Sequence, residues 1–133
     1  MTRPWLKQYE PGVPHTLEIP EMTLSDMFDE AVKTSPEQAA MSLFGRKIRY
    51  GEFGRQVEQL AIALHRLGVK VGDRVAIMLP NIPQYPIAHF AILKIGAIVV
   101  PTNPMYVERE LKHQLHDSGA ETILTLDFLF PRV

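Results

Sequence analysis

Five histidines are the side chains of this sequence best suited to acid–base or metal chemistry near neutral pH. His113 and His116 are three residues apart, a spacing that places both on one face of a helix. The pair supplies only two metal ligands, and no aspartate, glutamate or cysteine stands at a spacing that clearly completes a set of three or four. We therefore predict no metal site and interpret the pair as solvated helix surface.

The sequence lacks the usual motifs for nucleophilic catalysis and for phosphate binding. There is no Gly-x-Ser-x-Gly elbow, and the chain contains no cysteine, which excludes thiolate catalysis and disulfides. Neither Gly-x-Gly-x-x-Gly nor Gly-x-x-x-x-Gly-Lys-Ser/Thr occurs, and two prolines, which donate no hydrogen bond, occupy the turn at residues 79–83. We predict no catalytic residue in this chain and no tightly bound nucleotide.

Composition narrows the class of protein further. The 133 residues carry a net charge of −1, so no electrostatic footprint for nucleic acid is visible. The N-terminus lacks the apolar core of a signal peptide. The apolar window at residues 82–101 contains Lys94, which argues against a transmembrane segment. We predict a cytoplasmic protein.

Apolar periodicity predicts the elements that would position any site. Each amphipathic or apolar segment ends at a glycine or a proline, and the short apolar runs are typical of strands buried on both faces. The expected fold class is α/β: a β-hairpin plus a β-α-β-α-β parallel sheet flanked by helices. The predicted helices cover residues 23–35, 53–67, 81–95 and 107–118, the hairpin strands 39–44 and 47–50, and the parallel strands 75–79, 97–100 and 122–126.

Residues 1–20 contain four prolines and show no regular period. We predict an extended arm rather than a helix or a central strand, because each proline removes a donor and restricts its predecessor. Two interpretations stay open, a strap on its own domain or a strap on a neighbouring subunit. The apolar residues that make a plain solvated linker implausible are Trp5, Leu6, Tyr9, Val13, Leu17 and Ile19.

Residues 127–133 add three large apolar side chains after the last predicted strand without completing an element. A three-stranded parallel sheet is also small for its class. We interpret the chain as a truncated or dissected part of a larger protein. The alternative is a frayed apolar tail.

The order of elements resembles the N-terminal region of the adenylate-forming (AMP-binding) superfamily, which includes acyl-CoA synthetases, luciferases and peptide-synthetase adenylation domains. The resemblance rests on Tyr50-Gly-Glu-Phe and on a Leu-Lys-x-Gly-Ala-x-x-x-Pro-x-x-Pro block that looks like the first core motif of the family. The opening Pro-Trp, the following Tyr and the Pro-Gly-Val-Pro of residues 11–14 are similar to long-chain fatty-acid–CoA ligases. The residues of the block are Leu93, Lys94, Gly96, Ala97, Pro101 and Pro104.

This resemblance implies a parent enzyme that uses ATP and Mg to convert a fatty acid to an acyl-adenylate and then, with CoA, to acyl-CoA. The resemblance also implies that residues 21–133 are the first part of the N-terminal α/β subdomain, truncated before the catalytic motifs, which lie further along the chain in this family. The fragment itself is therefore expected to be inactive and to bind none of these cofactors tightly. A parent enzyme of this kind is expected in the cytoplasm or peripheral to a membrane. The alternative is a non-catalytic binding or dimerisation module that uses the same half-fold.

Two groups of site residues follow from the resemblance. The loop after the first core motif would lie at the edge of the CoA channel, which implicates Asn103, Met105 and Tyr106, although its prolines could equally stiffen a connection. The arm would serve as a dimer contact, as in some family members, through Trp5, Leu6 and Tyr9. Gly96, Lys94 and Pro101 are interpreted as structural.

Overall fold

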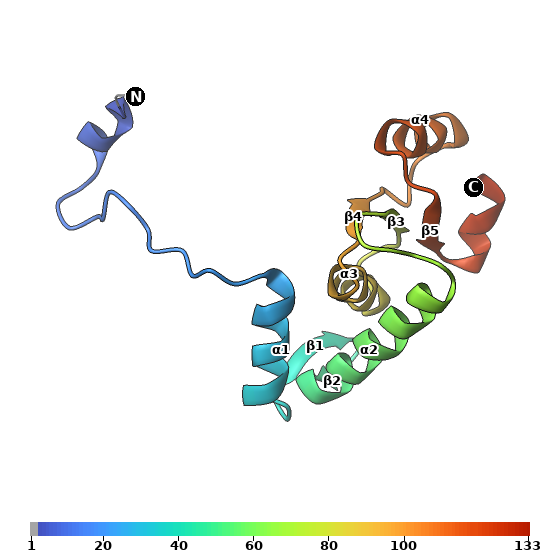
Figure 1. Ribbon diagram of the computed structural model, residues 1–133, viewed down its shortest axis with the longest axis horizontal. Helices are drawn as coiled ribbons and strands as arrows, with labels where there is room; N and C mark the ends of the chain where they lie inside the picture. Colours follow the sequence, from blue (N-terminus) through green and yellow to red (C-terminus); the bar gives the residue numbers. More distant parts are fainter. Residues whose placement is uncertain (1–2) are drawn as a thin grey trace.

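The computed structural model describes residues 3–133 as an α/β body with an N-terminal arm that runs away from it (Figure 1). The elements follow the predicted order. They are η1 (Pro4–Gln8), α1 (Leu24–Thr34), β1 (Ala39–Leu43), β2 (Arg46–Arg49), α2 (Tyr50–Arg66), β3 (Arg74–Met78), α3 (Gln84–Lys94), β4 (Ile98–Pro101), α4 (Glu108–Ser118), β5 (Thr122–Thr125) and η2 (Asp127–Arg132).

The strands form two separate sheets. β1 and β2 are an antiparallel hairpin, whereas β3, β4 and β5 form a parallel sheet in the order β4-β3-β5. In the parallel sheet Val75 of β3 lies opposite Val99 of β4 and Thr122 of β5. The predicted fold class, a hairpin plus a three-stranded parallel sheet flanked by helices, is confirmed.

The central strand β3 is buried on both faces, which explains its uninterrupted apolar sequence. Side chains of a strand alternate between the two faces of a sheet. Val75 and Ile77 accordingly pack into the cluster formed with α1, α2 and α3. Met78 packs with Leu111 of α4 and Leu129 of η2 in a second, smaller cluster. The helices therefore cover the sheet from two sides.

Three phenylalanine rings join the helices of the larger cluster. The ring of Phe28 in α1 lies edge-on to Phe53 of α2, with centroids 4.7 Å apart, and stacks on Phe90 of α3 at 4.3 Å. Lys94 of α3 adds a polar link to α1, because its Nζ donates to both carboxylate oxygens of Asp29 at 2.7 and 2.9 Å. The structural interpretation of Lys94 agrees with this contact.

Helix α1 begins at the predicted capping box. The Asp26 amide donates to Thr23 Oγ1, while the Thr23 amide and hydroxyl donate to the Asp26 carboxylate, and these bonds hold the pKa of Asp26 below its usual value. The predicted apolar face of α1 is only partly buried. Leu24 and Met27 are 57% and 51% exposed, and only Phe28 is fully buried. The sequence pattern therefore predicted a wider buried face than the fold provides.

Both ends of the chain differ from expectation. The arm is not wholly extended, because residues 4–8 form the 3-10 helix η1 with Pro4 at a helix start, where a missing N–H costs nothing. At the other end, residues 127–132 form a second 3-10 helix that buries Leu129, while Phe128 and Phe130 each stay 69% exposed. Among residues 3–133, no helix has both the length and the apolar character needed to cross a bilayer.

Candidate functional site

The carboxyl edge of the parallel sheet is the expected place for a ligand in this fold. β3, β4 and β5 run parallel, so the segments that follow Met78, Pro101 and Thr125 meet at this edge. Two threonines hold the strand ends there. The Thr102 amide donates to the Ile77 carbonyl at 3.0 Å, and Thr125 Oγ1 donates to the Met78 carbonyl at 3.2 Å. Thr102, a buried polar residue that the sequence did not single out, therefore fixes the start of the loop after β4.

The predicted loop residues lie next to one another at this edge, but their side chains differ in hydrogen bonding, packing and exposure. The Asn103 side chain accepts a hydrogen bond from the Met105 amide at 2.9 Å, and the Tyr106 amide donates to the Asn103 carbonyl. Tyr106 is half-buried and packs on the cluster of Met78 and Leu111. Met105 is 77% exposed. Of the three, only Met105 presents its whole side chain to a possible ligand.

The chemistry available at this edge is limited. The turn from β3 to α3 contains Pro80 and Pro83, so it offers few amide donors to an anion.

Within residues 3–133 no group of three or more histidine, aspartate or glutamate side chains could hold a metal ion. His113 and His116 are exposed on α4, in agreement with their interpretation as helix surface. His89, on α3, is half-buried against Phe90, and burial lowers its pKa.

The arm residues Trp5, Leu6 and Tyr9 do not reach the carboxyl edge. Trp5 and Tyr9 are exposed and Leu6 is only partly buried. The ring contact of Tyr9 is with His15, at 5.9 Å, within the arm itself. No residue between positions 3 and 20 is fully buried, which favours the second interpretation of the arm over a strap on its own body.

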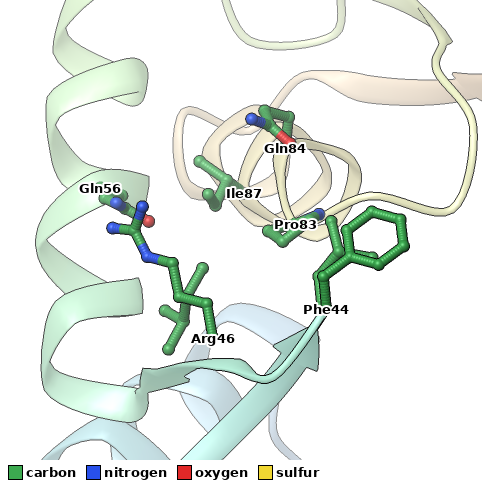
Figure 2. A pocket seen from close by; sticks show the side chains of 8 residues that line it. Phe44, Arg46, Gln56, Pro83, Gln84 and Ile87 are labelled. Carbon is green, nitrogen blue, oxygen red and sulfur yellow. The ribbon is translucent and has the colours of Figure 1, made fainter.

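Sequence reasoning missed a hollow between the hairpin, α2 and α3. It encloses about 390 Å³, and its walls are largely apolar, with Leu43, Ile48, Pro83 and Ile87. Figure 2 shows Gln56 and Arg46 on one side of it and Phe44 on the other, with the Phe44 ring turned away. A second hollow of about 260 Å³ adjoins it and shares Leu43 and Pro83.

The hairpin turn beside this hollow is unusual. We predicted Gly45 and Arg46 as the turn residues, but Leu43 pairs with Arg46, which leaves Phe44 and Gly45 as the two-residue loop. Both have positive φ, 48° and 83°, as a type I′ turn requires. This region suits glycine or asparagine and is costly for a bulky residue. Gly45 signalled the turn in the sequence, whereas the position of Phe44 within the loop follows from the pairing of Leu43 with Arg46.

Sequence comparisons show the family of the chain. A family model described as AMP-binding enzyme matches residues 28–132. The chain is 41% identical to the long-chain-fatty-acid–CoA ligase of Bacillus subtilis (strain 168), over 98% of the chain and 23% of that protein. It is also 37% identical to bacitracin synthase 3 of Bacillus licheniformis, over 80% of the chain and 2% of that protein.

A solved structure agrees with the sequence matches. The N-terminal subdomain of Klebsiella oxytoca NpsA superposes with a TM-score of 0.75 at 35% identity, covering 78% of this chain and 27% of that one. The chain therefore spans about a quarter of the length of the ligase and of the subdomain that it matches.

Proposed function

The chain belongs to the AMP-binding enzyme family, and we propose that it forms the first part of the N-terminal domain of a long-chain fatty-acid–CoA ligase. The observation that carries this proposal is the 41% identity to the Bacillus subtilis ligase across nearly the whole chain. The proposed parent enzyme uses ATP and Mg to activate a fatty acid and transfers the acyl group to CoA. Its location in the cytoplasm or peripheral to a membrane stays a prediction.

The proposed contribution of this segment is structural. Its domain organisation is an arm of residues 1–20 and a body of residues 21–133 that supplies three parallel strands and their covering helices. The described residues hold polar side chains at the carboxyl edge mainly in bonds to the backbone, such as those of Thr102 and Thr125. Such groups position a loop rather than carry out chemistry.

A chimera tests this function. Replacing the matching segment of the Bacillus subtilis ligase with this chain is expected to preserve fatty-acid-dependent acyl-CoA formation within about tenfold in kcat/KM, because a scaffold changes transition-state binding little. The chain alone is expected to release no pyrophosphate from ATP with fatty acid and CoA. The ligase with the segment deleted is the negative control.

Two outcomes would contradict the proposal. A chimera that folds but makes no acyl-CoA would favour the alternative, a non-catalytic binding or dimerisation module. Turnover by the chain alone would refute the expectation that it lacks catalytic residues.

We further propose that the loop from Asn103 to Tyr106 lines the edge of the CoA channel, with Met105 as the contacting side chain. Its exposure supports this role, since Asn103 and Tyr106 are engaged within the loop and the core. In the chimera, Met105→Ala is expected to raise KM for CoA and leave KM for the fatty acid unchanged, as measured by steady-state kinetics. Equal effects on both constants would remove the loop from this role.

We also propose that the arm contacts a neighbouring subunit. The exposure of Trp5, Tyr9, Val13, Leu17 and Ile19 supports this role. Joint replacement of Trp5, Leu6 and Tyr9 by alanine is expected to shift any dimer towards monomer in sedimentation velocity. An unchanged distribution of species would exclude the arm as a dimer contact.

A further inference from the structure

The loop between β4 and α4 is held at both ends by hydrogen bonds. At its start, the Thr102 amide donates to the Ile77 carbonyl at 3.0 Å, directly after the last residue of β4. At its end, the Val107 amide donates to the Glu110 carboxylate at 3.0 Å. The course of the backbone between these two points depends on residues 103–106.

Residues 103–106 form one tight turn. The Tyr106 amide donates to the Asn103 carbonyl at 3.1 Å, which is the bond that closes a β-turn. A type II turn would need a positive φ at Met105, but Phe44 is the only non-glycine residue among residues 3–133 that has one. The turn is therefore of type I, which favours asparagine at its first position and proline at its second. Asn103 and Pro104 occupy these positions.

The side chain of Asn103 closes the turn a second time. Its Oδ1 accepts a hydrogen bond from the Met105 amide at 2.9 Å, the contact of an Asx turn. The atom facing this donor is the oxygen, since the NH2 group of an asparagine cannot accept a hydrogen bond. Asn103 thus binds the amides of both residues that follow Pro104, and the proline ring fixes its own φ. The backbone at Met105 is set before any ligand arrives.

The side chain that this turn presents is that of Met105, which is 77% exposed. Ordering a flexible loop on binding lowers affinity, and a loop already held in its bound conformation avoids that cost. We infer that Asn103 is a positioning residue, which holds Met105 towards CoA and does not itself contact CoA. This inference rests on the proposed place of the loop at the edge of the CoA channel.

Direct contact with CoA is the competing role for Asn103. The residue is exposed, so its Nδ2 could donate to an oxygen of the ligand. Serine separates the two roles, because its hydroxyl accepts from a nearby backbone amide as asparagine does, more weakly, but it lacks the amide nitrogen. Alanine removes both functions.

Steady-state kinetics of the chimera with the Bacillus subtilis ligase test the inference. Asn103→Ala is expected to raise KM for CoA by about 2- to 10-fold, the range that the loss of one hydrogen bond produces. The kcat and KM for the fatty acid should not change, because the turn affects only CoA binding. Asn103→Ser should keep KM for CoA within about twofold of the parent value. Gln59→Ala is the control, since it removes an exposed side-chain amide from α2.

A double-mutant cycle shows whether Asn103 acts through Met105. In the Met105→Ala background, Asn103→Ala should raise KM for CoA no further, because the side chain that the turn presents is already gone. A residue that contacts CoA independently would multiply its effect with that of Met105→Ala.

Amide exchange in the full chain tests the turn without any enzyme activity. By NMR, the Met105 amide is expected to exchange about 2- to 10-fold faster in Asn103→Ala than in the parent, with Asn103→Ser between them. The amide of Val107, which is held by Glu110, is the internal reference and should keep its rate.

Three results would each overturn the positioning role while the proposed loop at the CoA channel stands, provided that Met105→Ala raises KM for CoA. They are an unchanged KM for CoA in Asn103→Ala, an increase in Asn103→Ser as large as in Asn103→Ala, and multiplied effects in the double variant. If Met105→Ala leaves KM for CoA unchanged, the loop does not contact CoA and both proposals fail. An unaltered exchange rate of the Met105 amide in Asn103→Ala would refute the turn as the cause.

Discussion

Replacing Phe28 by alanine is expected to reduce the free energy of unfolding by about 3–5 kcal/mol. Phe28 is 6% exposed and is the one fully buried residue of α1. Its ring contacts both Phe53 and Phe90, so the substitution removes two of the three pairwise contacts in the aromatic cluster. Because a domain of this size is stable by only about 5–15 kcal/mol, a loss of this magnitude should release α1 or unfold the body.

Urea unfolding followed by circular dichroism measures this change, with Phe130→Ala as the matched control. Phe130 has the same side chain but is 69% exposed on η2, so its truncation should alter stability by no more than about 0.5 kcal/mol. If Phe28→Ala cost as little as the control, the cluster of three rings would not be the contact that holds α1 to the body.

The order and type of the elements could be predicted from the sequence because buried segments of this fold have clear apolar patterns. The run from Val75 to Leu79 is apolar at every position, and β3 is covered on both faces. Gly96 follows α3 where a positive φ is needed, and the structure has it at 74°. The capping box at Thr23 fixed the start of α1 in the same local way.

Other features could not be predicted, because local sequence does not say what covers a surface. Leu24 and Met27 follow the helical period of a buried face, yet both are more than half exposed. The turn at Phe44 was misplaced by one residue because glycine, the stronger turn former, was given the first position. A register shift of this size depends on strand pairing between Leu43 and Arg46, which is a tertiary contact.

The candidate site, too, could be predicted from the sequence only in part. Asn103, Met105 and Tyr106 could be placed at the carboxyl edge from the strand that precedes them. Which of them is free to contact a ligand depends on the Asn103–Met105 hydrogen bond and on the packing of Tyr106. The hollow at Gln56 arises from three elements that are distant in sequence, so no local pattern could reveal it.

A second large loss of stability is expected when a larger residue replaces Gly54, where α2 crosses α1. A Cβ atom at this position would lie 2.8 Å from Cγ1 and 3.1 Å from Cγ2 of Val32. Val32 is β-branched and stiff within its helix, so it cannot easily move aside. Gly54→Leu should therefore reduce the free energy of unfolding by about 1–3 kcal/mol through overpacking. This loss should exceed the gain of about 1 kcal/mol that leucine brings in helix propensity.

The decisive measurement is a double-mutant cycle with Val32→Ala, again by urea unfolding. Removing the two methyl groups makes room for the new side chain, so the double variant should be more stable than the sum of the single effects predicts, by about 0.5–3 kcal/mol. Ala63→Leu on the exposed side of α2 is the control, with an expected change within about 0.5 kcal/mol. Additive effects of Gly54→Leu and Val32→Ala would mean that the helices separate instead of clashing at this crossing. In that case the contact with Val32 would not be the reason for the small residue at Gly54.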